Sequence, residues 1–239
     1  MSKRSFVALG LAWGWTITGQ GAVSSHEEAD AQALELARQA IALRSVAGPG
    51  NQTPQVAALF REALLKNDFN PKDITITPVD DTALLMARWP GSNPKLKPLV
   101  ISGHMDVVEA KPADWQRDPF TPVVENGYLF GRGSTDMKLD DTMAIAALGK
   151  LRKGGFKPRR DIILGLSGDE ETAMKTGSMI AEQLANAELV LNMDGANGVL
   201  DDKDRQTCLF RLGGRRKNLC RLSHDRHQPW GGTHRNPGR

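Results

Sequence analysis

Cysteine is almost absent from this 239-residue sequence, and both copies lie near its end. Cys208 and Cys220 are twelve positions apart, whereas the paired cysteines of a zinc finger are separated by about two to four residues. The sequence therefore does not predict a zinc finger. Two cysteines in one segment also define neither a disulfide framework nor a redox compartment.

Long apolar stretches are lacking too, except at the N-terminus. Lys3 and Arg4 precede an apolar run, and small residues follow it up to Ser24. This order is typical of a secretory signal peptide, so we predict one at residues 1–24 and an exported chain, periplasmic or secreted. The alternative is a buried first helix or strand, which the glycines spread through this segment disfavour. Elsewhere no run reaches the roughly 18 apolar residues of a membrane span, so we expect no membrane contact after cleavage.

Acidic residues are scarce only in the C-terminal part. Residues 205–239 hold nine lysines and arginines and a single acid, Asp225. The net charge of +3 therefore describes this segment, and the rest of the chain is net acidic. Charge thus gives no reason to expect a nucleic-acid partner.

Hydrophobic periodicity predicts alternating helices and strands. Helices are expected from Glu27 to about Val46, from Thr53, a cap-like residue before Pro54, to about Asn67, and at 140–153 and 177–184. Strands are expected at 73–79, 82–88, 98–103, 161–167 and 188–193, and the last three read as buried strands. This order predicts an α/β fold with a largely parallel sheet flanked by helices.

Metal-capable side chains follow each of the three buried strands. These residues are His104 and Asp106 after the first, Glu170 and Glu171 after the second and Asp194 after the third, and the glycine-rich segment 131–136 adds Asp136. Ligands in α/β sheets gather at the carboxyl ends of strands, so we expect these side chains to lie together. Each alone has an ordinary explanation as a hydrogen-bonded histidine, a helix cap or a solvated carboxylate. Together, one histidine and several carboxylates suit zinc, and carboxylates can bridge two ions.

Five motifs occur in an order that resembles the M20 metallopeptidases. They are SGHMDVV at 102–108, W-x-x-DPF at 115–120, NGYLFGRGSTDMK at 126–138, GDEE at 168–171 and NMDG at 192–195. The family includes carboxypeptidases, aminoacylases, succinyl-diaminopimelate desuccinylases and dipeptidases, and the resemblance covers about residues 30–206. It implies the N-terminal part of a di-zinc catalytic domain that acts on a peptide or N-acyl-amino-acid substrate. It also implies that the full-length form is a homodimer.

The resemblance implies a ligand set for two Zn²⁺ ions. The implied ligands are His104, Asp136, Glu171 and Asp194. Asp136 would bridge the two ions, Asp194 would bind the same ion as His104, and Glu171 would bind the other.

The two remaining residues are implied to be catalytic. Asp106 would orient His104 through a hydrogen bond, and Glu170 would be the general base. In hydrolysis of an amide, such a base takes a proton from the attacking water and returns it to the leaving amine.

The family pattern breaks after about residue 206. The lid or dimerisation domain, and the last section that supplies a second histidine ligand, have no counterpart in this sequence. The tail histidines, His224, His227 and His234, lie in a basic segment without a strand pattern. We therefore expect residues 25–206 to be a partial catalytic domain, residues 207–239 to be a disordered tail translated out of frame, and the chain to be inactive as it stands. The alternative is a non-enzymatic metal-binding protein whose basic tail contacts acidic partners.

Overall fold

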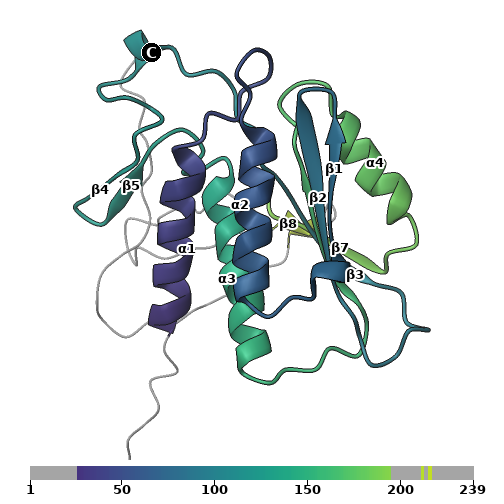
Figure 1. Ribbon diagram of the computed structural model, residues 1–239. Helices are drawn as coiled ribbons and strands as arrows, with labels where there is room; N and C mark the ends of the chain where they lie inside the picture. The colour runs from purple at the N-terminus through teal and green to yellow at the C-terminus, as the bar shows by residue number, and fades with distance from the viewer. Residues whose placement is uncertain (1–25, 195–210, 213–214, 217–239) are drawn as a thin grey trace, which may run out of the picture.

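The computed structural model describes residues 26–194, 211–212 and 215–216 (Figure 1). The helices are α1 (His26–Ile41), α2 (Thr53–Lys66), α3 (Lys138–Lys153) and α4 (Lys175–Gln183), with short 3-10 turns η1 (Pro71–Asp73) and η2 (Pro112–Asp114). The strands are β1 (Ile74–Val79), β2 (Thr82–Trp89), β3 (Leu99–His104), β4 (Val123–Glu125), β5 (Tyr128–Phe130), β6 (Ile162–Ser167), β7 (Leu189–Asn192), β8 (Arg211–Leu212) and β9 (Arg215–Arg216). The predicted signal peptide and most of the predicted tail lie outside the described residues.

Five strands form one mixed sheet in the order β1-β2-β6-β3-β7. β6, β3 and β7 are parallel neighbours, whereas β1 pairs antiparallel with β2, and β2 antiparallel with β6. The α/β class is confirmed, and the sheet is mixed rather than largely parallel. The reason is local: Asp80 and Asp81 alone join β1 to β2, and a connection this short can only make a hairpin.

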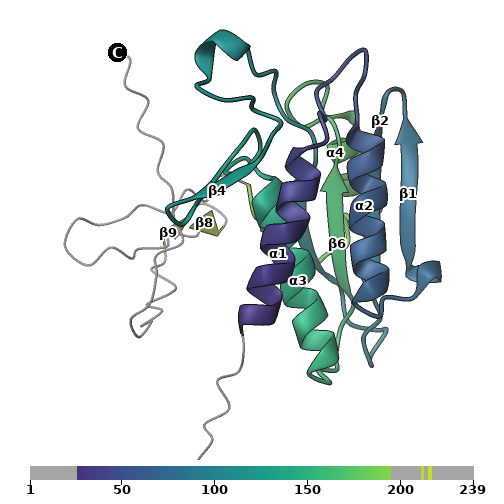
Figure 2. The same ribbon diagram turned by 60° about the vertical axis from the view of Figure 1, so that its left-hand side comes forward.

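Helices cover both faces of this sheet (Figures 1 and 2). Leu164 and Leu166 of β6 pack into the main core with Phe60 of α2 and Ile145 of α3. Gly165, between them, faces the other way, and a Cβ there would lie 3.1 Å from the Ile180 side chain of α4. This alternation follows from the two-residue period of a strand, and it makes β6 the centre of a three-layer arrangement.

Two helix ends differ from the predictions in instructive ways. α1 ends at Ile41 rather than near Val46, and the Lys138 ammonium donates to the carbonyls of Ala40 and Leu43, both at 2.8 Å. α2 begins at Thr53 after the N-cap residue Gln52, and the side-chain oxygen of Asn51 accepts from the Thr53 amide at 2.9 Å. In both places a side chain satisfies backbone groups that a helix end leaves unpaired.

The prediction that β7 is buried is wrong. β7 lies at the edge of the sheet that the described strands form, and Leu189 and Val190 are 44% and 51% exposed. Among the described strands only β3 pairs with it. An apolar run indicates a strand, but it does not reveal how many neighbours that strand has, and this is why the sequence was misleading here.

The segment between β3 and α3 leaves the sheet and forms the β4–β5 hairpin, which the sequence reading did not predict. Asn126 and Gly127, at the turn, both have positive φ angles, as the tight hairpin turn requires. Within the described residues, no helix combines the length and apolar character needed to cross a membrane.

Candidate metal centre

The carboxyl ends of β3, β6 and β7 meet at one edge of the sheet. Parallel pairing sets His104 opposite Ser167 and Ser102 opposite Asn192. Residues that follow these strands therefore emerge side by side, as the sequence predicted.

His104 is at the middle of this edge and is buried, with 1% exposure. Its Nδ1 atom lies 3.1 Å from the Asp106 carbonyl oxygen and 3.3 Å from Asp106 Oδ1. Its Nε2 atom lies 3.0 Å from Asp136 Oδ1 and 4.0 Å from Asp194 Oδ2. One ring nitrogen is thus held by Asp106, and the other faces two carboxylates.

Asp106 contacts more than the histidine. Its Oδ1 atom accepts the Glu170 amide at 3.1 Å, and Oδ2 accepts the Glu171 amide at 3.0 Å. The buried carboxylate therefore ties the end of β3 to the loop that follows β6. Charge-assisted bonds from two amides are among the stronger hydrogen bonds in proteins, so this link fixes the relative position of the two segments.

Two groups of possible metal ligands share His104. One combines His104 with Asp136 and Glu171, and the other combines it with Glu170 and Asp194. Within each group the ligand atoms lie within 4.8 Å of one another. All the residues singled out from the sequence are therefore brought together, although their separate roles stay predictions.

Three carboxylates in and beside the cluster, those of Glu170, Glu171 and Asp140, resist ionisation. Burial raises the pKa of Glu170 and of Glu171, and neighbouring carboxylates add to this, against a lowering effect of His104. Burial, with Asp136 and Asp194 nearby, raises the pKa of Asp140 to about 6. A divalent cation would relieve this excess of negative charge, and oxygen and imidazole donors suit zinc, so the residues fit such an ion.

His104 responds to the same charges in the opposite direction. Burial lowers its pKa, but the hydrogen bond and charge of Asp106, with Asp141 and Asp136, outweigh burial and raise the pKa to about 10. Without a cation, the imidazole is thus held as the positive partner of the carboxylates.

Two residues of the α3 N-terminus were not predicted as part of the site. Lys138, fully buried, ties α3 to the end of α1, and burial lowers its pKa to about 7 against the charges of Asp141 and Asp106. Both carboxylate oxygens of Asp141 are buried without a hydrogen-bond partner in the described part of the chain, and burial raises its pKa. Lys138 stands in a family motif, but nothing in the sequence marks Asp141 as buried.

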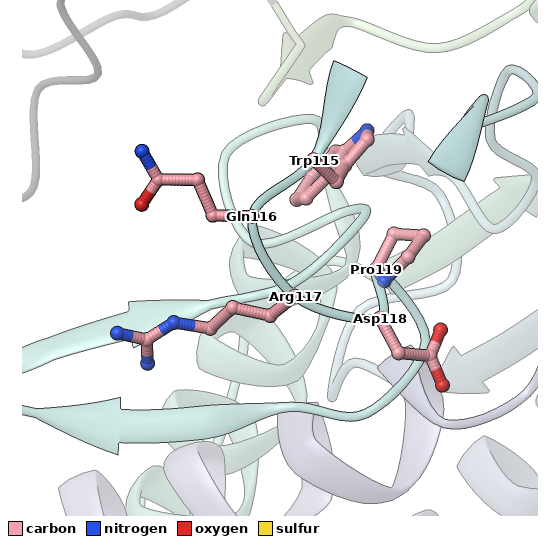
Figure 3. Close-up of a pocket in the computed structure, with 5 residues that line it drawn as sticks. All are labelled: Trp115, Gln116, Arg117, Asp118 and Pro119. Carbon is pink, nitrogen blue, oxygen red and sulfur yellow. The ribbon is translucent and has the colours of Figure 1, made fainter. Parts of the chain in front are cut away.

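An open pocket of about 400 Å³ lies elsewhere, along the loop from Trp115 to Pro119 (Figure 3). The Arg132 guanidinium stacks 5.3 Å from the centre of the Trp115 ring at this loop. None of the predicted site residues lines this pocket. The candidate site is therefore the strand-end cluster.

Fold and cluster together define the class: an α/β protein with a metal-capable site at the carboxyl ends of parallel strands. Residues 100–212 match peptidase family M20/M25/M40. The sequence is 37% identical over 114 residues to an N-fatty-acyl-amino acid synthase/hydrolase of Xenopus tropicalis, covering 46% of this chain and 22% of that protein. It is 37% identical over 144 residues to a succinyl-diaminopimelate desuccinylase of Alkalilimnicola ehrlichii, covering 59% and 35%.

The fold is similar to that of the dipeptidase Dug1p of Saccharomyces cerevisiae, with a TM-score of 0.61 and 21% identity over 72% of this chain and 40% of that one. Over part of its length this chain is therefore similar to peptidases and amidohydrolases of the M20 family. It spans between about a fifth and about a third of the length of the two relatives above.

Proposed function

We propose that the strand-end cluster is a two-zinc centre that hydrolyses the amide bond of a peptide or an N-acyl amino acid. The observation that carries this proposal is the convergence of two donor groups on one buried imidazole, His104. The donors come from three different strand ends and, in the case of Asp136, from the loop just before α3. A surface patch of acids would have neither the buried histidine nor the shared geometry.

The ligands of the two ions would be His104, Asp136, Glu171 and Asp194. Asp136 is the candidate bridge, because it lies 3.0 Å from His104 Nε2 and in the donor group of Glu171. Bound zinc would act as a Lewis acid that polarises the scissile carbonyl and lowers the pKa of the attacking water. Asp106 keeps the His104 ring oriented so that Nε2 faces the ligand side.

Glu170 is the proposed general base. Its raised pKa, due first to burial, brings it closer to neutrality, where a carboxylate can both accept and return a proton. It takes one proton from the attacking water, whose oxygen bonds to the carbonyl carbon. It then delivers that proton to the amide nitrogen as the carbon–nitrogen bond breaks, which releases an acid and an amine.

The substrate class rests on the relatives. The names of two of them describe an acyl group joined to an amino acid, and the similar structure is that of a dipeptidase. All three substrates contain an amide next to an amino-acid carbon, so this is the bond proposed here. The same comparisons favour an enzyme over a non-enzymatic metal-binding protein. The expected inactivity of this particular chain stays a prediction.

Zinc titration of a completed, in-frame version of the chain tests the centre. We expect that version to bind two zinc ions per chain by calorimetry and elemental analysis, and we expect Asp136→Ala to remove both, whereas the chain as it stands should bind zinc only weakly. Glu170→Gln should keep the zinc, because Glu170, although it lies in a donor group with His104 and Asp194, is proposed as the base and not as a ligand. Zinc binding that is unchanged in Asp136→Ala would contradict the bridge.

Hydrolysis of a panel of dipeptides and N-acyl amino acids, measured on the same samples, tests the base. A missing general base typically costs about 10²–10⁴-fold in rate. Turnover that persists undiminished in Glu170→Gln would therefore contradict its proposed role.

We also propose that the chain is exported, from the order of charge, apolar run and small residues in positions 1–24. Mass spectrometry of protein recovered from its native host should find a terminus near Ser25, outside the cytoplasm. An intact Met1 or Ser2 terminus on cytoplasmic protein would contradict export.

A further inference from the structure

The loop between β6 and α4 carries Glu170 and Glu171, and its two ends are joined by a buried carboxylate. Asp169 is 7% exposed and belongs to neither donor group. Its Oδ2 atom accepts the Lys175 amide at 2.8 Å, and Oδ1 accepts the Thr176 amide at 2.9 Å and the Thr176 hydroxyl. Asp169 thus holds the start of α4 from the other end of the loop.

Thr176 closes this arrangement into a ring. Its hydroxyl is fully buried, donates to Asp169 and accepts the Gly168 amide at 2.9 Å. Asp169 contributes its backbone as well, because its carbonyl oxygen accepts the Met174 amide at 2.8 Å. We call Asp169 and Thr176 the loop clasp.

The start of the loop, at Gly168, also packs closely against β2. A Cβ on Gly168 would lie 2.2 Å from the Ala83 carbonyl oxygen, so only glycine fits, and the Thr82 hydroxyl donates to the Gly168 carbonyl. The clasp therefore joins the central sheet to α4 at the point where the loop starts. The loop has little freedom to shift as a unit.

Glu170 and Glu171 lie between the clasp and Asp106. Asp106 accepts both of their backbone amides, but within the described residues no hydrogen bond reaches either side-chain carboxylate. The directions of these two side chains consequently depend on their backbone, which the clasp and Asp106 hold from opposite sides.

We propose that the loop clasp positions the metal centre: Asp169 and Thr176 set the backbone from which Glu171 reaches the cation and Glu170 reaches the attacking water, without touching the cation themselves. This inference rests on the proposed metal-binding function. Three donors converge on the Asp169 carboxylate. An amide in its place offers one acceptor oxygen and adds donors of its own, so Asp169→Asn must loosen the loop.

Zinc and cobalt binding to the full chain test the clasp. Outer residues that orient metal ligands typically contribute about 10–100-fold in metal affinity, and we expect a loss of this size in Asp169→Asn and in Thr176→Val. The absorption spectrum of bound Co²⁺ should change in both variants, because it reports ligand geometry. Thr176→Ser keeps the hydroxyl and should restore both affinity and spectrum.

Asp161→Asn is the matched control. Asp161 also joins separate segments, since it accepts from Arg88 Nε at 2.6 Å and from the Gly91 amide at 2.8 Å, but it precedes β6 at the opposite end of the strand. Its replacement should lower thermal stability and leave zinc affinity and the Co²⁺ spectrum unchanged. Equal effects of Asp161→Asn and Asp169→Asn on metal binding would overturn the proposal, since a merely structural role predicts that result.

Amide hydrogen exchange in metal-free protein tests the effect of the loop clasp on the loop independently of metal binding. In chelator-treated protein, the amides of Glu170 and Glu171 should exchange about tenfold faster or more in Asp169→Asn, and not in Asp161→Asn. Unchanged exchange overturns the clasp. A parent chain that binds no metal but shows this exchange difference overturns the proposed function and leaves the clasp supported as the element that positions the loop.

Discussion

The inner and outer halves of the candidate centre are built differently. The inner half, His104 and Asp106, has side chains only 1% and 4% exposed, and both are held by several partners. The outer half includes Asp136 and Asp194, whose side chains are 54% and 31% exposed. The protein fixes the histidine through its surroundings and leaves the carboxylates free to close on a cation.

The negative charges of the cluster are not balanced by an equal number of basic side chains. A structural ion-pair network would pair each acid with a base, and its carboxyl pKa values would fall. Here burial and neighbouring carboxylates raise the pKa of Glu170, Glu171 and Asp140 instead. Titratable groups that disfavour one another in this way are characteristic of functional sites, because the missing charge arrives with the ligand.

The largest expected effect follows from replacing the residue common to both donor groups. His104→Gln removes the only imidazole of the described cluster, and we expect zinc binding to be lost, by at least about 10²-fold in affinity. Calorimetric titration measures the loss. Gln39→Ala, on the exposed face of α1, is a control that should leave affinity unchanged. Near-normal binding in His104→Gln would mean that the two donor groups are not one centre.

A smaller effect is expected from the partner of His104 on the inner side. Asp106→Asn keeps the shape but leaves the Glu170 and Glu171 amides competing for one acceptor oxygen, so zinc affinity should fall about 10–100-fold. It should also lower the melting temperature, because the residue is buried and multiply bonded.

The outer Asp194→Asn is the comparison for Asp106→Asn. It should reduce zinc affinity without a comparable loss of stability, since its side chain is 31% exposed and no hydrogen bond ties its carboxylate to another segment of the described chain. Thermal scans with chelator present give the stability of each variant. Equal destabilisation by both substitutions would remove the distinction between the inner and outer halves.

The sequence predicted which residues gather at the strand ends, because these residues are tied to elements with strong local patterns. The predicted ends of β3, β6 and β7 lie within about two residues of the observed ones. The parallel pairing of these strands then brings the residues that follow them together. Burial of Asp141 and the capping contact of Lys138 depend instead on how α1 and α3 pack together. Such contacts join residues nearly a hundred positions apart, and no local pattern encodes them. The loop clasp is partly local: Asp169 stands in the GDEE motif, but nothing in the sequence marks its contact with α4, and Thr176 stands in no motif.

A moderate effect is expected from pH, because protons and zinc compete for the His104 imidazole. In the metal-free protein the pKa of His104 is raised to about 10, against an ordinary value of 6.5. Its contribution to stability is therefore fully present below about pH 6.5 and is lost as pH rises toward 10. Zinc competes with that proton, so zinc affinity should increase over the same range.

Thermal unfolding with chelator, from pH 6.5 to 9, checks the sign. The melting temperature should fall with rising pH in the parent chain, and His104→Gln should flatten the curve. A melting temperature that rises through this window in the parent would mean that the metal-free imidazole is not held as a cation.

The smallest effect is expected at the edge strand β7, where a substitution should change self-association but not zinc binding. Leu189 on β7 and Leu151 on α3 are both leucines with 44% exposure, but only Leu189 lies on a strand whose outer edge pairs with no other described strand. Exposed apolar edges promote strand pairing between molecules, and a lysine on the edge opposes it. Leu189→Lys should therefore reduce self-association in light scattering more than Leu151→Lys does.

Both should leave zinc affinity unchanged, and both should change stability by no more than about 0.5 kcal/mol, as is usual for surface positions. Equal reductions in association by the two variants would show that exposed apolar area, rather than the free edge of β7, drives contact between chains.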